Sequence, residues 1–141
     1  MPIDILWPVF ALVAWIFVVW FWMYVARFSL IRRQPPTAED FASGANALRY
    51  FEPVEMPANN LRNLFEMPVL FLALVPLLMI THQAGHVQVA LAWAFVGLRV
   101  VHSYVQIVVK RIPLRFMVYL ASCAVLAAMW IGFFADLAMA R

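Results

Sequence analysis

The sequence predicts an all-α membrane protein, a bundle of four transmembrane helices forming a single domain over residues 1–141. Hydrophobic residues make up 67% of the chain and charged residues only 12%, and the mean hydropathy is +0.89, far from the usual balance of a soluble domain. Four apolar stretches have roughly the 20 residues that a helix needs to cross a bilayer. They cover about residues 3–24, 58–80, 87–109 and 114–138.

The first stretch is dense in tryptophan and is followed by a cluster of arginines, an arrangement typical of anchoring at a membrane interface. It has no basic segment before it and is longer than the apolar part of a signal peptide, so we expect a retained span. The polar segment 27–57 is the one substantial loop, and its middle part, residues 38–50, is predicted to form a short interfacial helix.

The second stretch contains Pro68 and Pro76, where kinks are expected because proline cannot donate a backbone hydrogen bond. The connections at 81–86 and 110–115 are short, so consecutive spans should be antiparallel neighbours. Pro113 is placed to begin the last helix.

The basic residues are distributed unevenly between the two sides of the bundle. The connection after the second stretch has no Lys or Arg, and most of the ten cations lie in or beside the connections after the first and third stretches. Cytoplasmic loops collect Lys and Arg, so we expect these two connections in the cytoplasm and both termini on the outer side. The net charge of +3 is then a topology signal, and we expect no nucleic-acid partner.

Two polar stripes lie near the predicted cytoplasmic ends of the second and third spans. Each stripe repeats at three- and four-residue intervals and therefore lies on one helical face. An ionisable group inside a bilayer is costly and requires a partner or a role, so an ion pair between Glu66 and Arg99 is expected. The stripes comprise Asn59, Arg62, Asn63 and Glu66 on one span and Arg99, His102, Gln106 and Lys110 on the other.

Two interpretations of the stripes remain open. They could be a structural polar cluster that fastens two helices together. Alternatively, they could line a pocket open to the cytoplasm for a small ligand carrying carboxylates, with Arg62, Arg111 and Arg115 near its mouth.

No metal site is expected, because His82 and His86 flank a short turn without a third ligand. The single cysteine, Cys123, allows no intramolecular disulfide.

Two sequence runs carry a family resemblance. Residues 59–71, with the Asn63-x-x-Glu66 core, resemble the second-helix signature of the membrane-associated proteins in eicosanoid and glutathione metabolism, the MAPEG family. Residues 99–104, followed by Gln106 and Arg115, resemble the third-helix pattern of its bacterial members. The resemblance implies a homotrimer of four-helix subunits in a bacterial inner membrane, with periplasmic termini, that binds glutathione between subunits near the cytosolic face.

The same resemblance implies the roles of individual residues. An arginine after the third helix would stabilise the glutathione thiolate, and the catalytic candidates are Arg111 and Arg115. The candidates for contacting glutathione are Asn63, Glu66, Arg99, His102, Tyr104 and Arg62.

Two functions follow from this sequence. The first is a glutathione transferase or peroxidase that acts on lipophilic electrophiles dissolved in the bilayer. The alternative is a non-catalytic accessory or structural subunit of a larger membrane complex, which would use the aromatic first span as its contact surface. Asn59 favours the alternative, because glutathione-using members have an arginine there. A transporter is disfavoured because no repeat of interrupted helices is evident.

Overall fold

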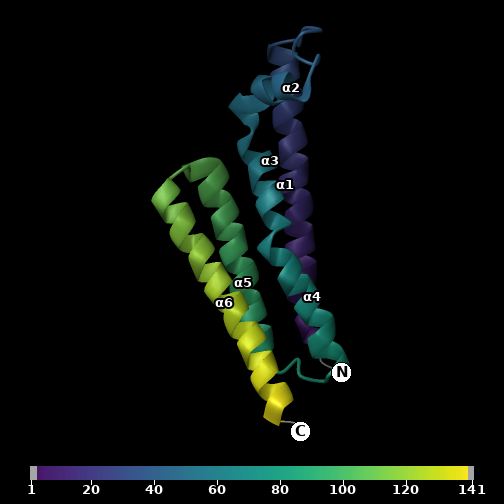
Figure 1. The fold of residues 1–141 in the computed structure, drawn as a ribbon, viewed down its shortest axis with the longest axis vertical. Helices are drawn as coiled ribbons and strands as arrows, with labels where there is room; N and C mark the ends of the chain where they lie inside the picture. Colours follow the sequence, from purple (N-terminus) through teal and green to yellow (C-terminus); the bar gives the residue numbers. More distant parts are fainter. Residues whose placement is uncertain (1–2, 140–141) are drawn as a thin grey trace.

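The computed structural model describes residues 3–139 and consists of helices that form four membrane-crossing units (Figure 1). No strand occurs among these residues, so the predicted all-helical, four-span fold class is confirmed. The first unit comprises a 3-10 turn, η1 (Ile3–Ile5), and α1 (Leu6–Arg33). The others are α3 (Met56–Leu64) with α4 (Met67–Ile80), α5 (His86–Tyr104) with a π-helical turn η3 (Val105–Val109), and α6 (Ile112–Met139).

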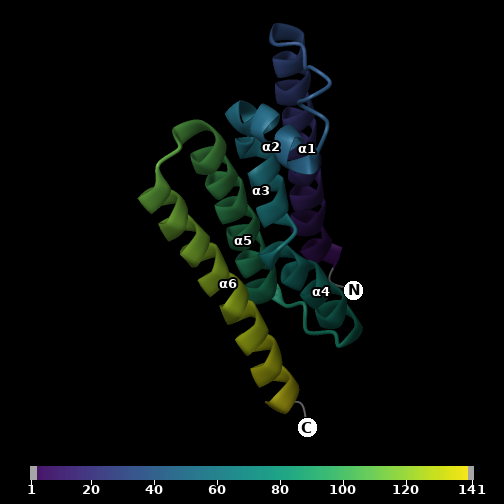
Figure 2. The same cartoon turned by 45° about the horizontal axis from the view of Figure 1, so that its top comes forward.

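The four units pack as two pairs. Helices α5 and α6 form an antiparallel hairpin, and α1 runs beside α3 and α4 (Figures 1 and 2). The connection between α5 and α6 lies at the same end of the bundle as the long loop, and both chain ends lie at the opposite end (Figure 1). Helix α5 is the most buried of the four spans. Its polar residues are therefore protected from lipid.

The first helix continues to Arg33, well past the end expected near residue 24. With η1 this unit has 31 residues, about 46 Å of helix at 1.5 Å per residue, which exceeds the roughly 30 Å of a hydrocarbon core. Its last turns therefore project beyond the apolar layer and carry the loop. An ion pair of 3.4 Å between Arg27 and Glu55 fastens the end of the loop to α1.

The loop contains a short helix, α2 (Gly44–Phe51), followed by a 3-10 turn, η2 (Glu52–Val54). Helix α2 begins later than the predicted 38–50 because Ser43 caps it, accepting a hydrogen bond from the backbone N–H of Asn46. Before it, Asp40 accepts hydrogen bonds from the backbone N–H and the hydroxyl of Thr37. These bonds lower the pKa of Asp40 because they favour its ionised form.

The second span is interrupted at Phe65 and Glu66, between α3 and α4. The interruption lies just before Pro68, which cannot donate to the carbonyl four residues back and disfavours helical geometry in the preceding residue. The expected effect at Pro76 is weaker, since α4 continues through it. The break at Pro68 leaves backbone carbonyls at the end of α3 free to accept other hydrogen bonds.

The third span ends in the π-helical turn η3. Lys110 closes this turn: its N–H donates to the carbonyl of Val105 at 2.7 Å, and its φ of 58° is left-handed. A π-turn inserts one extra residue into a helical turn and often marks a functional site. Here it carries Gln106, which is only 2% exposed and faces α3.

Candidate functional site

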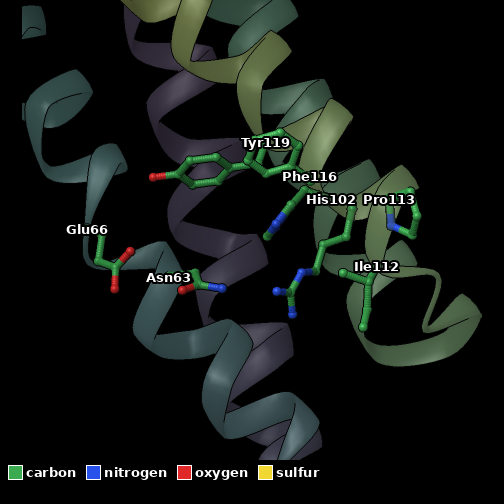
Figure 3. A pocket seen from close by; sticks show the side chains of 8 residues that line it. Asn63, Glu66, His102, Ile112, Pro113, Phe116 and Tyr119 are labelled. Carbon is green, nitrogen blue, oxygen red and sulfur yellow. The ribbon is translucent and has the colours of Figure 1, made fainter.

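A cavity of about 480 Å³ lies between the α3–α4 break and the first turns of α6, at the end of the bundle that carries the loop. We call it the main cavity. Figure 3 shows the side chains of α6 on one side, Asn63 and Glu66 on the other, and His102 of α5 between them. Its lining consists of Asn63, Glu66, His102, Ile112, Pro113, Arg115, Phe116 and Tyr119. The volume falls within the range of small-molecule sites.

The helix break presents the two polar residues on the α3–α4 side. Glu66 is the N-cap of α4 and its side chain is exposed, so it faces the cavity without burying its charge. Asn63 donates from Nδ2 to Oε1 of Gln106 at 3.1 Å, and the same oxygen accepts from Nδ2 of buried Asn60 at 2.9 Å. These bonds orient the Asn63 amide and leave its Oδ1 free to accept a hydrogen bond.

Arg99 lies behind the cavity and is fully buried. Its Nη2 donates to the backbone carbonyl of Asn63 at 3.1 Å, and its guanidinium lies 5.6 Å from the ring centroid of Tyr119. The predicted ion pair with Glu66 is wrong: within residues 3–139 the ion pair at 4.0 Å or less is Arg27–Glu55. The guanidinium instead takes the carbonyl that the α3–α4 break exposes, while Glu66 stays at the exposed edge.

A hydrogen-bonded chain holds the Arg99 segment against α1. The indole N–H of Trp15 donates to Oγ of Ser103 at 3.0 Å, and Ser103 donates to the carbonyl of Arg99 at 3.0 Å. Nε and Nη1 of Arg99 have no partner among the described residues. The cation is therefore fixed in position but incompletely satisfied, as expected of a group that supports a polar site.

His102 and Tyr119 form the inner wall of the main cavity. Their ring centroids are 5.8 Å apart, and Tyr119 extends from α6 towards the Glu66 side (Figure 3). Nδ1 of His102 is buried without a partner in the described part of the chain. The sequence patterns did not point to Tyr119; its signal was the four-residue spacing from Arg115, which puts both on one face of α6.

The sequence model of the MAPEG family matches residues 5–135, a range that enters all four spans. The chain belongs to the MAPEG family. No curated protein and no solved structure matches the chain. As a MAPEG protein it is a multi-pass membrane protein of a family whose members generally use glutathione.

The residues singled out from the MAPEG resemblance fall into three groups. Four of them, Asn63, Glu66, His102 and Arg115, line the main cavity, and Arg99 supports it from behind. Arg111 lines a smaller neighbouring cavity of about 240 Å³, which also contains Arg115. Arg62 and Tyr104 are exposed and line neither cavity.

The main cavity of this MAPEG protein carries both signs of charge. Arg115 supplies a cation, Glu66 supplies a carboxylate, and Asn63 and His102 supply neutral polar groups. Such a site can bind a zwitterionic ligand through charge-assisted hydrogen bonds. Within residues 3–139, no three His, Cys, Asp or Glu side chains are close enough to hold a metal ion.

Proposed function

We propose that this protein binds glutathione in the main cavity and conjugates it to lipophilic electrophiles, or uses it to reduce lipophilic peroxides. The observation that carries the proposal is that a single cavity is lined by both the Glu66 carboxylate and the Arg115 guanidinium, together with the oriented amide of Asn63. Membership in the MAPEG family supports the same ligand.

The residues present fit the chemistry of glutathione. Its ammonium group suits the carboxylate of Glu66, and its peptide groups suit the free Oδ1 of Asn63 and the unpartnered Nδ1 of His102. The two ligand carboxylates need further donors, which a neighbouring subunit would supply. We therefore include in the proposal a homotrimer with glutathione at the subunit boundary.

Bound glutathione would supply a thiol sulfur as the nucleophile. The guanidinium of Arg115 would favour the thiolate, because a nearby cation lowers the pKa of a thiol. Tyr119 can donate a hydrogen bond to the sulfur, and Arg99 contacts the face of the Tyr119 ring from within the bundle. Ile112 and Phe116 give the cavity an apolar wall, along which a substrate dissolved in the bilayer would approach.

The location of the site follows from the orientation of the chain. The cavity lies at the end of the bundle that holds the basic loop and the α5–α6 connection. Because cations collect on the cytoplasmic side, we place the cavity at the cytoplasmic face and the termini in the periplasm of a bacterial inner membrane. Cytosolic glutathione would then reach the site without crossing the membrane.

The test compares two arginines, of which Arg115 lines the main cavity and Arg111 does not. Arg115→Gln should lower kcat for conjugation by about 100-fold or more, the usual effect of removing one donor to a developing anion. Arg111→Gln is the matched control and should retain activity, because Arg111 does not line the main cavity. Equal losses in both variants would show that general surface charge, not the main cavity, supports the reaction.

A second function, a non-catalytic accessory subunit, is favoured by the surface of α1. Large aromatic side chains, including Phe17 and Phe21, are exposed along this helix, and Asn59 occupies the position of a family arginine. Purification in mild detergent separates the two functions. A homotrimer isolated alone favours the enzyme, and stable co-purification with other membrane subunits favours the accessory role.

A further inference from the structure

We propose that the turn between α5 and α6 binds the phosphate group of an anionic phospholipid. Lys110, Arg111 and Arg115 bring three cations to the 240 Å³ cavity, here called the turn cavity. Its other lining residues are Met56, Gln106 and Ile112, so no carboxylate is present. The main cavity, by contrast, contains Glu66. The charge of the turn cavity therefore selects an anion and not a zwitterion.

Gln106 adds a donor that points to the same ligand. Its Oε1 is occupied by the amides of Asn60 and Asn63, so the amide NH₂ of Gln106 is directed away from them. Gln106 is 2% exposed and lines the turn cavity, so its NH₂ group is placed to meet a ligand there. A phosphate oxygen in the turn cavity would accept a charge-assisted hydrogen bond from this NH₂ group.

The backbone at the turn adds to the attraction for an anion. Helix α6 begins at Ile112, and the first N–H groups of a helix have no intrahelical acceptor and form the positive end of its dipole. The left-handed Lys110 produces the sharp reversal that places this helix start beside the three cations.

The surface below the turn fits acyl chains. Ile112, Phe116 and Leu120 are spaced by four on α6 and are 72%, 57% and 45% exposed. They form an apolar stripe that leads from the turn cavity along a membrane-spanning helix. A phospholipid can bind the cations with its phosphate and cover the stripe with its chains, whereas free phosphate could use only the first contact. The combination therefore selects a lipid.

The experiment measures phosphatidylglycerol binding to the detergent-purified full chain by native mass spectrometry. The double variant Lys110→Asn/Arg111→Gln removes two cations, and asparagine tolerates the left-handed backbone at position 110. Each cation near a lipid surface contributes a factor of about five to the affinity, so removing two should lower the affinity about 25-fold. The matched control, Arg32→Gln/Arg33→Gln, removes two exposed cations outside the turn cavity and should leave the affinity unchanged.

Competition experiments identify the ligand and separate this proposal from glutathione binding. Phosphatidylcholine should bind more weakly than phosphatidylglycerol, and excess inorganic phosphate should not displace the lipid. Glutathione binding should persist in the Lys110→Asn/Arg111→Gln variant, because neither residue lines the main cavity. Equal losses in the two double variants, or displacement by inorganic phosphate, would each overturn the assignment of the turn cavity to a phospholipid. Retained helical circular dichroism in each variant confirms that the bundle remains folded.

Discussion

Replacing Gln106 by leucine should destabilise the bundle by about 1–3 kcal/mol. Gln106 accepts two hydrogen bonds, from Asn60 at 2.9 Å and from Asn63 at 3.1 Å. Hydrogen bonds between membrane helices contribute about 0.6 kcal/mol each on average, which gives about 1.2 kcal/mol for the pair. Asn60 is fully buried, and its Oδ1 already lacks a partner among the described residues. Without the Gln106 oxygen, Nδ2 of Asn60 would also lose its acceptor. The cost of this unpaired donor raises the upper bound to about 3 kcal/mol.

The assay is reversible unfolding in mixed micelles of detergent and sodium dodecyl sulfate, followed by far-ultraviolet circular dichroism. Gln106→Asn is the first control, because its shorter neutral side chain keeps an amide acceptor oxygen and should lose less stability. Asn60→Leu/Gln106→Leu is the second, because replacing both partners by apolar groups removes the orphaned donor. If Gln106→Leu is as stable as the wild type, or if the double variant loses the sum of its two single losses, the hydrogen-bond argument is refuted.

Two further predictions concern contacts between helices. Trp15→Phe removes the hydrogen bond from the indole to Ser103 and should cost about 0.6 kcal/mol in the same unfolding assay; an unchanged stability would contradict the role of this bond. Gly132→Ala would put a Cβ 3.2 Å from Nε2 of Gln88, so the gain of about 1 kcal/mol expected for alanine in a helix should be lost in the wild type. The gain should reappear in a Gln88→Ala background, and identical effects in both backgrounds would disprove the contact.

The sequence was sufficient for the fold class because a membrane span is encoded by the composition of a single continuous segment. Each of the four apolar stretches could be read without knowing its neighbours, and the structure has a long apolar helix at each. The length of α1 was underestimated because its final turns carry arginines, which are typical of a loop at the end of a membrane span. In the structure these residues continue the helix to Arg33, outside the apolar layer.

The details of the site depend on which hydrogen-bond or ion-pair partner a side chain selects among several nearby groups. Helical periodicity cannot predict this choice. The spacing placed Glu66 and Arg99 on facing stripes and so favoured an ion pair. In the structure the break before Pro68 offers Arg99 a nearer acceptor, the carbonyl of Asn63. Tyr119 was missed for a similar reason: on an apolar helix its aromatic ring reads as a lipid-facing side chain until the packing of α6 against α5 is known.

The central claim, that the main cavity binds glutathione, is tested most directly by isothermal titration calorimetry on the purified protein. The claim predicts saturable binding to the wild type and binding about 10- to 100-fold weaker in Glu66→Gln, since a hydrogen bond to a charged group contributes about 1.5–3 kcal/mol. Glu52→Gln, at an exposed loop position outside the main cavity, should bind like the wild type. No saturable binding to the wild type, or equal weakening in the two variants, would contradict the claim.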